Sequence, residues 1–177
     1  HIEDAVIDAG PGNDKITLKR TSNRYIKNLT IEGGDGEDAL DLDADEIHGI
    51  QAVAETIKVK AKGNGEISDL KFDGSEVTID LNNNFSDSTI ESGKATVNVK
   101  GNGKPSEINI CAQQISLNAN NNLLSSNIAG NNIDINLKGN SKVDGSIFFG
   151  SSSQSLGGNI EITANNGFIG STIYGGN

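Results

Sequence analysis

The sequence has no tryptophan and no methionine, and its only aromatic residues are five Phe and two Tyr. Large side chains are therefore too few to fill the core of a helical bundle. Glycine is abundant instead, with 22 residues, and Asn and Ser are frequent, which favours tight turns and stacked small side chains. With 177 residues and 34% apolar residues, the chain can still form one domain with a substantial core.

Cysteine is nearly absent as well. The single Cys111 excludes an internal disulfide and a cysteine-based zinc site. Because Ile108 and Ile110 lie beside it, we expect an inert thiol near the core. No apolar run reaches the length of a membrane span, and neither a signal peptide nor an initiator Met is present. We therefore expect His1 to begin a processed or excised fragment.

The net charge of −10 argues against a nucleic-acid partner and makes cations the more natural one. Acidity is uneven along the chain. Residues 1–50 hold 12 of the 24 carboxylates and only 5 of the 14 basic residues. The two ends of the molecule are therefore expected to differ in function.

A short pattern of three alternating apolar residues, followed by a Gly or Asn corner, recurs along most of the chain. Its clearest copies begin at Val77, Ala95, Ile115 and Ile133. We place the turn starts at Ala5, Leu29, Ile57, Val77, Ala95, Ile115, Ile133 and Ile160, with spacings of 24, 28, 20, 18, 20, 18 and 27 residues. A second apolar position follows thirteen residues later in nearly every turn, from Leu18 to Ile173.

Such a repeat predicts an all-β fold, a single parallel β-helix (β-solenoid) of about 8 coils of 18–28 residues, right-handed. We divide this one continuous domain into acidic coils at residues 1–56 and regular coils at residues 57–177. Longer returns lie at Thr21–Asn28, Asp43–Thr56 and Gly150–Asn159, and the middle one is either a short helix or a third strand. The last residues, Phe168–Asn177, carry no polar cap, so flanking segments of a longer chain or an oligomer are expected to cover this end.

Two corners differ from the others, Ala9–Thr17 and Gly33–Asp41. The second matches the nonapeptide G-G-x-G-x-D-x-U-x in full, and the first departs from it only in Ala9. In these corners the sequence resembles the repeats-in-toxin (RTX) calcium-binding family of secreted toxins, adhesins and exoenzymes. The resemblance covers about 18 of the 177 residues.

The resemblance implies that backbone carbonyls and Asp carboxylates of these corners hold Ca²⁺, a hard cation that takes six to eight oxygen ligands. The alternative is a pair of Gly/Asp turns without metal. Two acidic loops at adjacent strands would repel unless a cation lay between them, which favours the metal. The predicted metal-binding residues are Gly10, Gly12, Asp14, Gly34, Asp35, Gly36 and Asp38.

Beyond these corners, our alignment of the turns places Asn in one corner column of the later coils. Asn and Gly tolerate left-handed backbone best, so we expect one bend geometry throughout, with stacked Asn amides bonding from coil to coil. The acidic column of Asp14 and Asp38 reaches Glu66 in that alignment, and no metal is expected beyond it. The predicted structural ladder is Asn64, Asn84, Asn102, Asn122 and Asn140.

Other candidates are a lone histidine and a basic cluster. No Cys and no second internal His lies near His48 in the sequence, so we interpret it as structural or solvated. Lys19, Arg20, Arg24 and Lys27 resemble, loosely, the basic groups of calcium-dependent polyuronate lyases, or else they balance local acid. Polar outward columns beginning at Lys58 and Lys60 are either a solvated face or a contact for glycans or another protein.

These patterns favour a calcium-stabilised repeat segment of a larger secreted or cell-surface bacterial protein, an adhesin or toxin-like exoprotein. Its role would be structural or binding rather than enzymatic. The alternatives are a polysaccharide-acting enzyme or its accessory module, of polyuronate lyase or epimerase type, and a phage-tail or fibre component. The expected cofactor is Ca²⁺, and a glycan, host-surface or protein partner is open.

Overall fold

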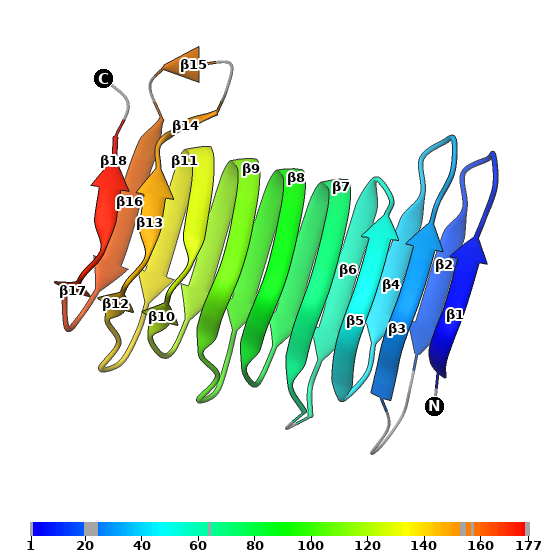
Figure 1. The fold of residues 1–177 in the computed structure, drawn as a ribbon, viewed down its shortest axis with the longest axis horizontal. Helices are drawn as coiled ribbons and strands as arrows, with labels where there is room; N and C mark the ends of the chain where they lie inside the picture. Colours follow the sequence, from blue (N-terminus) through cyan, green and yellow to red (C-terminus); the bar gives the residue numbers. More distant parts are fainter. Residues whose placement is uncertain (1, 20–24, 64, 153–154, 157, 176–177) are drawn as a thin grey trace.

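The computed structural model describes residues 2–19, 25–63, 65–152, 155–156 and 158–175. These residues form a rod of stacked β-coils with the two chain ends at opposite ends of the rod (Figure 1). The described residues form no helix, and so they contain no helix that could cross a membrane. The strands are β1 (Ile2–Asp8), β2 (Lys15–Lys19), β3 (Tyr25–Glu32), β4 (Ala39–Asp43), β5 (Glu46–Val53), β6 (Thr56–Ala61), β7 (Ile67–Leu81), β8 (Phe85–Val99), β9 (Pro105–Ala119), β10 (Leu123–Leu124), β11 (Asn127–Leu137), β12 (Val143–Asp144), β13 (Ile147–Phe149), β14 (Ser151–Ser152), β15 (Ser155–Leu156), β16 (Asn159–Ala164), β17 (Phe168–Ile169) and β18 (Thr172–Tyr174).

The predicted parallel β-solenoid is confirmed, because the strands of its 16-stranded sheet pair in parallel from coil to coil. The first face contains β1, β3, β5 and the early parts of β7, β8 and β9. The second contains β2, β4, β6 and the late parts of the same long strands. The nearer strands in Figure 1 run upward, the farther ones run downward and the coil advances to the left, so the winding is right-handed.

The second face shows the stacking most clearly. Each step advances the chain by 17 to 27 residues, from 40 to 57 at the shortest and from 133 to 160 at the longest. One inward column passes from Ile16 through Leu40, Ile57, Val77, Ala95, Ile115 and Ile133 to Ile160.

The core is a set of such apolar columns. Strand β6 alternates buried Ile57, Val59 and Ala61 with outward Lys58 and Lys60, as a half-buried strand of period two requires. The bulkiest fully buried side chains are Phe72, Phe85 and Phe148, and all other core positions carry Ile, Leu, Val or Ala. Few aromatics suffice, because each coil buries its inward face against two neighbours.

The predicted register is wrong in the first coils. Leu29 pairs with Ile50 and not with Ile57, whose partner is Leu40. The predicted register is shifted by half a coil, so that it aligns strands of the first face with strands of the second. Both faces alternate apolar and polar residues with the same period, so the inward pattern fits both alignments. As a consequence, the two Gly/Asp corners and the Asn corners lie at opposite edges of the rod.

The structure also tests the predictions for two of the longer returns and for Cys111. The return at 43–56 is strand β5, so it forms no helix. The return at 150–159 contains the antiparallel pair β14 and β15, and residues 153, 154 and 157 lie outside the described part. The expectation for Cys111 is wrong: its side chain is exposed, because Ile110 and Ala112 take the inward positions beside it.

A left-handed bend recurs within the first face, and the sequence reading missed it. Asn28, Asp69, Asp87, Glu107 and Ser125 all have φ between 46° and 54°, and they occupy one column. Gly49, Gly145 and Gly170 continue the column with φ of 56° to 63°. The bend that every coil shares therefore lies here, at residues that tolerate positive φ to different degrees.

Buried serines satisfy the backbone next to this bend. Ser88 accepts a hydrogen bond from the N–H of Leu70 at 3.1 Å and donates to the carbonyl of Ser86 at 2.7 Å. Ser126 likewise accepts a hydrogen bond from the N–H of Ile108 at 3.3 Å and donates to the carbonyl of Leu124 at 2.7 Å. The hydroxyl thus replaces a backbone bond that the bend removes.

The Ser126→Ala change should lower the free energy of unfolding by about 1–3 kcal/mol, because the N–H of Ile108 is left buried without its acceptor. Urea denaturation followed by circular dichroism measures this. The exposed Ser75 supplies the control, and Ser75→Ala should change stability by less than about 0.5 kcal/mol. Equal effects of the two changes would contradict the role given to the buried hydroxyl.

Candidate functional site

The two Gly/Asp corners stack directly on each other in the same backbone conformation. Gly10 and Gly34 have φ of 84° and 101°, and Gly12 and Gly36 have φ of 141° and 144°. The N–H of Gly12 donates to the carbonyl of Asp35 at 2.7 Å. Positive φ at matched positions requires glycine in both coils, so the motif's glycines serve one shared turn.

The carbonyl oxygens of the first corner are directed at the second corner. A methyl group at Gly34 would collide with the carbonyl oxygen of Gly10, and one at Gly36 would collide with that of Gly12. Glycine is therefore needed in the second corner for space as well as for conformation. Backbone oxygens and glycine Cα atoms face each other between the two coils.

Asp38 is the most unusual side chain of these corners. It is only 2% exposed. Its Oδ1 accepts a hydrogen bond from the N–H of Asp14 at 2.8 Å, whereas its Oδ2 is buried without a hydrogen-bond partner. Gly33 makes room for this arrangement, because a Cβ there would collide with the Asp38 carboxyl group. A buried carboxylate oxygen without a partner is energetically costly.

The acidic column continues into the third coil at Glu55. Its Oε2 accepts a hydrogen bond from the N–H of Asp38 at 2.7 Å, just as Asp38 serves Asp14 one coil earlier. The strand pairs Lys15 with Ala39 and Ala39 with Thr56 place Asp14, Asp38 and Glu55 in one column. The expected continuation at Glu66 is wrong, because Glu66 precedes the buried Ile67 at the opposite edge.

The remaining predicted ligands are more open. Asp35 and Glu37 are exposed, and Asp14 is half-buried. The N–H of Glu37 donates to the side-chain oxygen of Asn13 at 3.2 Å. Across the described residues, no three His, Cys, Asp or Glu side chains converge as metal ligands do. An ion here would need backbone carbonyls and water for most of its ligands, which suits Ca²⁺ better than a softer metal.

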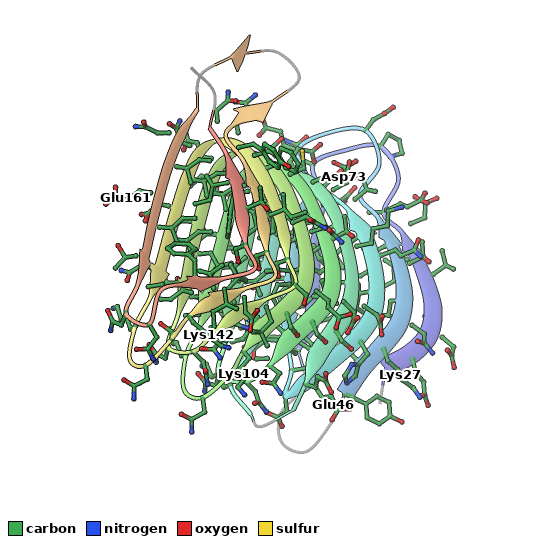
Figure 2. The ribbon with its side chains drawn as sticks, turned by 60° about the vertical axis from the view of Figure 1, so that its left-hand side comes forward. Lys27, Glu46, Asp73, Lys104, Lys142 and Glu161 are labelled. Carbon is green, nitrogen blue, oxygen red and sulfur yellow. The ribbon has the colours of Figure 1, made fainter. Side chains whose placement is uncertain are left out.

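The Asn corners bond mainly to backbone. Asn84 and Asn122 accept hydrogen bonds from the N–H groups of Lys104 and Lys142, at 3.1 and 3.0 Å. The carbonyls of Asn102 and Asn140 accept from other Asn side chains, at 3.2 and 2.7 Å. Asn64 lies outside the described residues. Figure 2 shows Lys104 and Lys142 together at this edge of the rod.

A ladder between amide side chains lies elsewhere, on the second face. Asn118 donates to Asn98 at 3.1 Å, and Asn98 donates to Asp80 at 2.8 Å. These residues belong to one of the outward columns read from the sequence, and the pairing confirms that column from Lys60 to Thr163. The ladder could be found from the repeat itself, because Asn occupies the same strand position in successive coils.

The second face also carries a groove of about 440 Å³. Its walls include Lys94, Gln114, Ser116 and Asp134. At its rim, Lys94 donates to Glu76 at 2.9 Å, and this bond and charge lower the pKa of Glu76. Both side chains are about half exposed, so the pair stabilises the fold only slightly.

The basic cluster offers no catalytic arrangement among its described members. Lys27 forms an ion pair with Glu3 at 3.0 Å, and the hydrogen bond and charge of Glu3 raise the pKa of Lys27. Lys19 is exposed on β2 and pairs in register with Asp43. Arg20 and Arg24 lie outside the described residues.

His48 has two side-chain partners, as expected for a structural residue. Its Nδ1 lies 2.8 Å from the hydroxyl of Ser68, and its Nε2 lies 2.9 Å from the carboxylate of Glu46. Both partners belong to the first face or its edge. The side chain thus links neighbouring coils.

No family model, curated protein or solved structure matches the chain.

The stacked corners predict different effects for two glycines of similar conformation. Gly34→Ala should lower the free energy of unfolding more than Gly10→Ala, because only Gly34 faces a backbone oxygen, whereas Gly10 has no atom within 4 Å of an added Cβ. Both changes carry the cost of positive φ, of roughly 1 kcal/mol, so their difference isolates the collision. Urea denaturation of both variants measures it, and equal destabilisation would rule out the close stacking.

Proposed function

We propose that the chain is a calcium-stabilised β-solenoid segment of a larger exported bacterial protein, an adhesin or toxin-like exoprotein resembling the RTX family in its first two corners. Its role is structural and binding. The observation that carries this proposal is the buried, unpartnered Oδ2 of Asp38 within the column formed with Asp14 and Glu55.

Electrostatics supports the choice of a cation. Strands stacked roughly 4.8 Å apart bring like charges of one column close together, where they repel. A hard divalent ion beside Asp38 would give its free oxygen a partner and would offset repulsion from Asp14 and Glu55. Asp38, Asp14 and the carbonyls of Gly10, Gly12, Gly34, Asp35 and Gly36 would hold it, and Glu55 extends the predicted set.

Calcium dependence would suit export. At low intracellular Ca²⁺ the acidic coils would be less stable, and external Ca²⁺ would stabilise the folded rod by binding it preferentially. The polar second face, with its amide ladder and groove, would then offer regular hydrogen-bonding groups to a glycan or surface protein. A secreted or cell-surface location follows from the same reasoning.

Calcium should raise the melting temperature over that in EDTA. At a free concentration one hundred times the dissociation constant, the gain is about 2.7 kcal/mol, or about 5–10 °C for a domain of this size. Calorimetry in the two buffers measures it. An unchanged melting temperature in EDTA would remove calcium from the proposal.

The Asp38→Asn variant tests the site itself. Asparagine keeps an oxygen for the N–H of Asp14 and removes the charge, so the shift caused by calcium should largely disappear. Asp134→Asn is the matched control, since Asp134 is an exposed carboxylate on β11 in a distant coil, and its shift should equal that of the wild type. If Asp38→Asn retained the full shift, the ion would bind elsewhere.

A further inference from the structure

The Asn corners carry a second repeat, which spans two coils. The pattern Lys-Gly-Asn-x-Lys occurs at residues 100–104 and again at residues 138–142, and the related Lys-Gly-Asn-Gly-Glu lies at residues 62–66. The coils between these copies carry three consecutive Asn instead, at residues 82–84 and 120–122. Lysine thus alternates with asparagine from one coil to the next along this edge of the rod.

Backbone pairing places the alternating residues in one column. The N–H groups of Lys100, Asn120 and Lys138 donate to the carbonyl of the last residue of β7, β8 and β9, at 2.7, 3.3 and 2.8 Å. All three side chains are exposed. Because stacked strands are roughly 4.8 Å apart, the backbones of the two lysines are roughly 10 Å apart, and Asn120 lies between them.

A hollow of about 240 Å³ is lined by both of these lysines. Its wall also includes Asn98, Asn118 and Asn120, so the amide ladder of the second face forms one side of it. None of the described residues that line the hollow is a carboxylate. An anion bound there would meet two positive charges and several amide groups, without a negative charge to repel it.

The corners add further positive charge beside the hollow. Lys104 and Lys142 follow Lys100 and Lys138 in the chain, and Figure 2 shows Lys104 and Lys142 together at this edge. Of these four lysines, only Lys142 forms an ion pair with a described residue, Asp144, at 2.9 Å. The whole chain has a net charge of −10. A group of lysines with so few carboxylates is therefore a local reversal of charge, which favours an anionic ligand.

We propose that this edge binds an acidic polysaccharide with one carboxylate on every second sugar. The polysaccharide lies along the rod, where Lys100 and Lys138 bind successive carboxylates. The Asn120 amide bonds to hydroxyl groups of the neutral sugar between them. Two sugars of an extended polysaccharide are about as long as two coils, so the charges of ligand and protein recur at the same interval. The inference rests on the binding role proposed above and names its ligand, but it does not depend on the calcium site at the opposite edge.

Other polyanions match this edge less well. A polyuronate with a carboxylate on every sugar would place one carboxylate beside Asn120, where no lysine offsets its charge. Single-stranded nucleic acid has a phosphate at every unit, and proteins bind it mainly by stacking its bases on aromatic side chains. None of the described residues that line the hollow is aromatic. The alternation of Lys and Asn therefore favours an alternating polysaccharide over both.

Isothermal titration calorimetry with hyaluronan oligosaccharides, in which glucuronate alternates with a neutral sugar, tests the binding. The Lys100→Gln/Lys138→Gln variant should bind roughly tenfold more weakly than the wild type, since each exposed ion pair contributes a factor of up to about five. Lys58→Gln/Lys71→Gln is the matched control, because it changes the net charge equally at exposed residues of other columns, and it should bind like the wild type.

All of these changes are at exposed positions, so both variants should keep the melting temperature of the wild type. A wild type that does not bind, or an equal loss of affinity in the two variants, would overturn the proposal. The calcium-induced rise in melting temperature is a separate measurement, so failure of polysaccharide binding and failure of the calcium site are distinct results.

A second titration tests the period of two coils. The wild type should bind hyaluronan oligosaccharides more tightly than oligogalacturonates with the same number of sugars, although the oligogalacturonates carry more carboxylates. Asn120→Lys places lysine in three successive coils, so its preference should shift toward oligogalacturonate. Attraction by charge alone would favour oligogalacturonate in both proteins. That result, or tighter binding of single-stranded DNA by the wild type, would contradict the proposed ligand.

Discussion

Every coil of this protein depends on hydrogen bonds to the coil before and the coil after it, and this requirement constrains the rest of the structure. Strands can remain in register over a long rod only if each coil bends at the same places. The left-handed column is one result, in which residues as different as Asn28, Glu107 and Ser125 share φ between 46° and 54°. Glu107 adopts a conformation that its own type disfavours, because Asp87 and Ser125 beside it hold the same bend.

The fold could be predicted from the sequence because apolar alternation at a repeat of about 20 residues has few other solutions. The register of the first coils could not. Ala5–Ile7 and Ile16–Leu18 have the same inward pattern, so the pattern does not distinguish one face from the other. The bend column would have shown the correct alignment, but its residues are Asp, Asn, Gly, Glu and Ser, which resemble ordinary surface positions.

The arrangement of the two Gly/Asp corners could be predicted from the sequence only in part. The glycines of the two corners do stack in matched conformation, and Asp14 and Asp38 occupy one column. Glu55 was missed, since it lies 17 residues after Asp38, whereas the preceding step is 24 residues. Its role depends on the short third coil, which follows from the pairing of β4 with β6 and leaves no motif in the sequence. Buried Ser126 was missed for the same reason: only the coil beside it shows which N–H needs an acceptor.

Two kinds of side chain bond to the backbone groups that the bends leave without a partner on the neighbouring strand. Neutral serines do this along the first face of the later coils, at Ser88 and Ser126, without adding charge to the interior. Carboxylates do it at the corners of the early coils, at Asp38 and Glu55, and they add charge to one column of stacked coils. A serine column can be extended indefinitely, whereas each added carboxylate increases repulsion along its column. Carboxylates can therefore bond to these backbone groups in only a few coils unless a cation offsets their charge. This limit explains why a rod of uniform fold has one chemically distinct end.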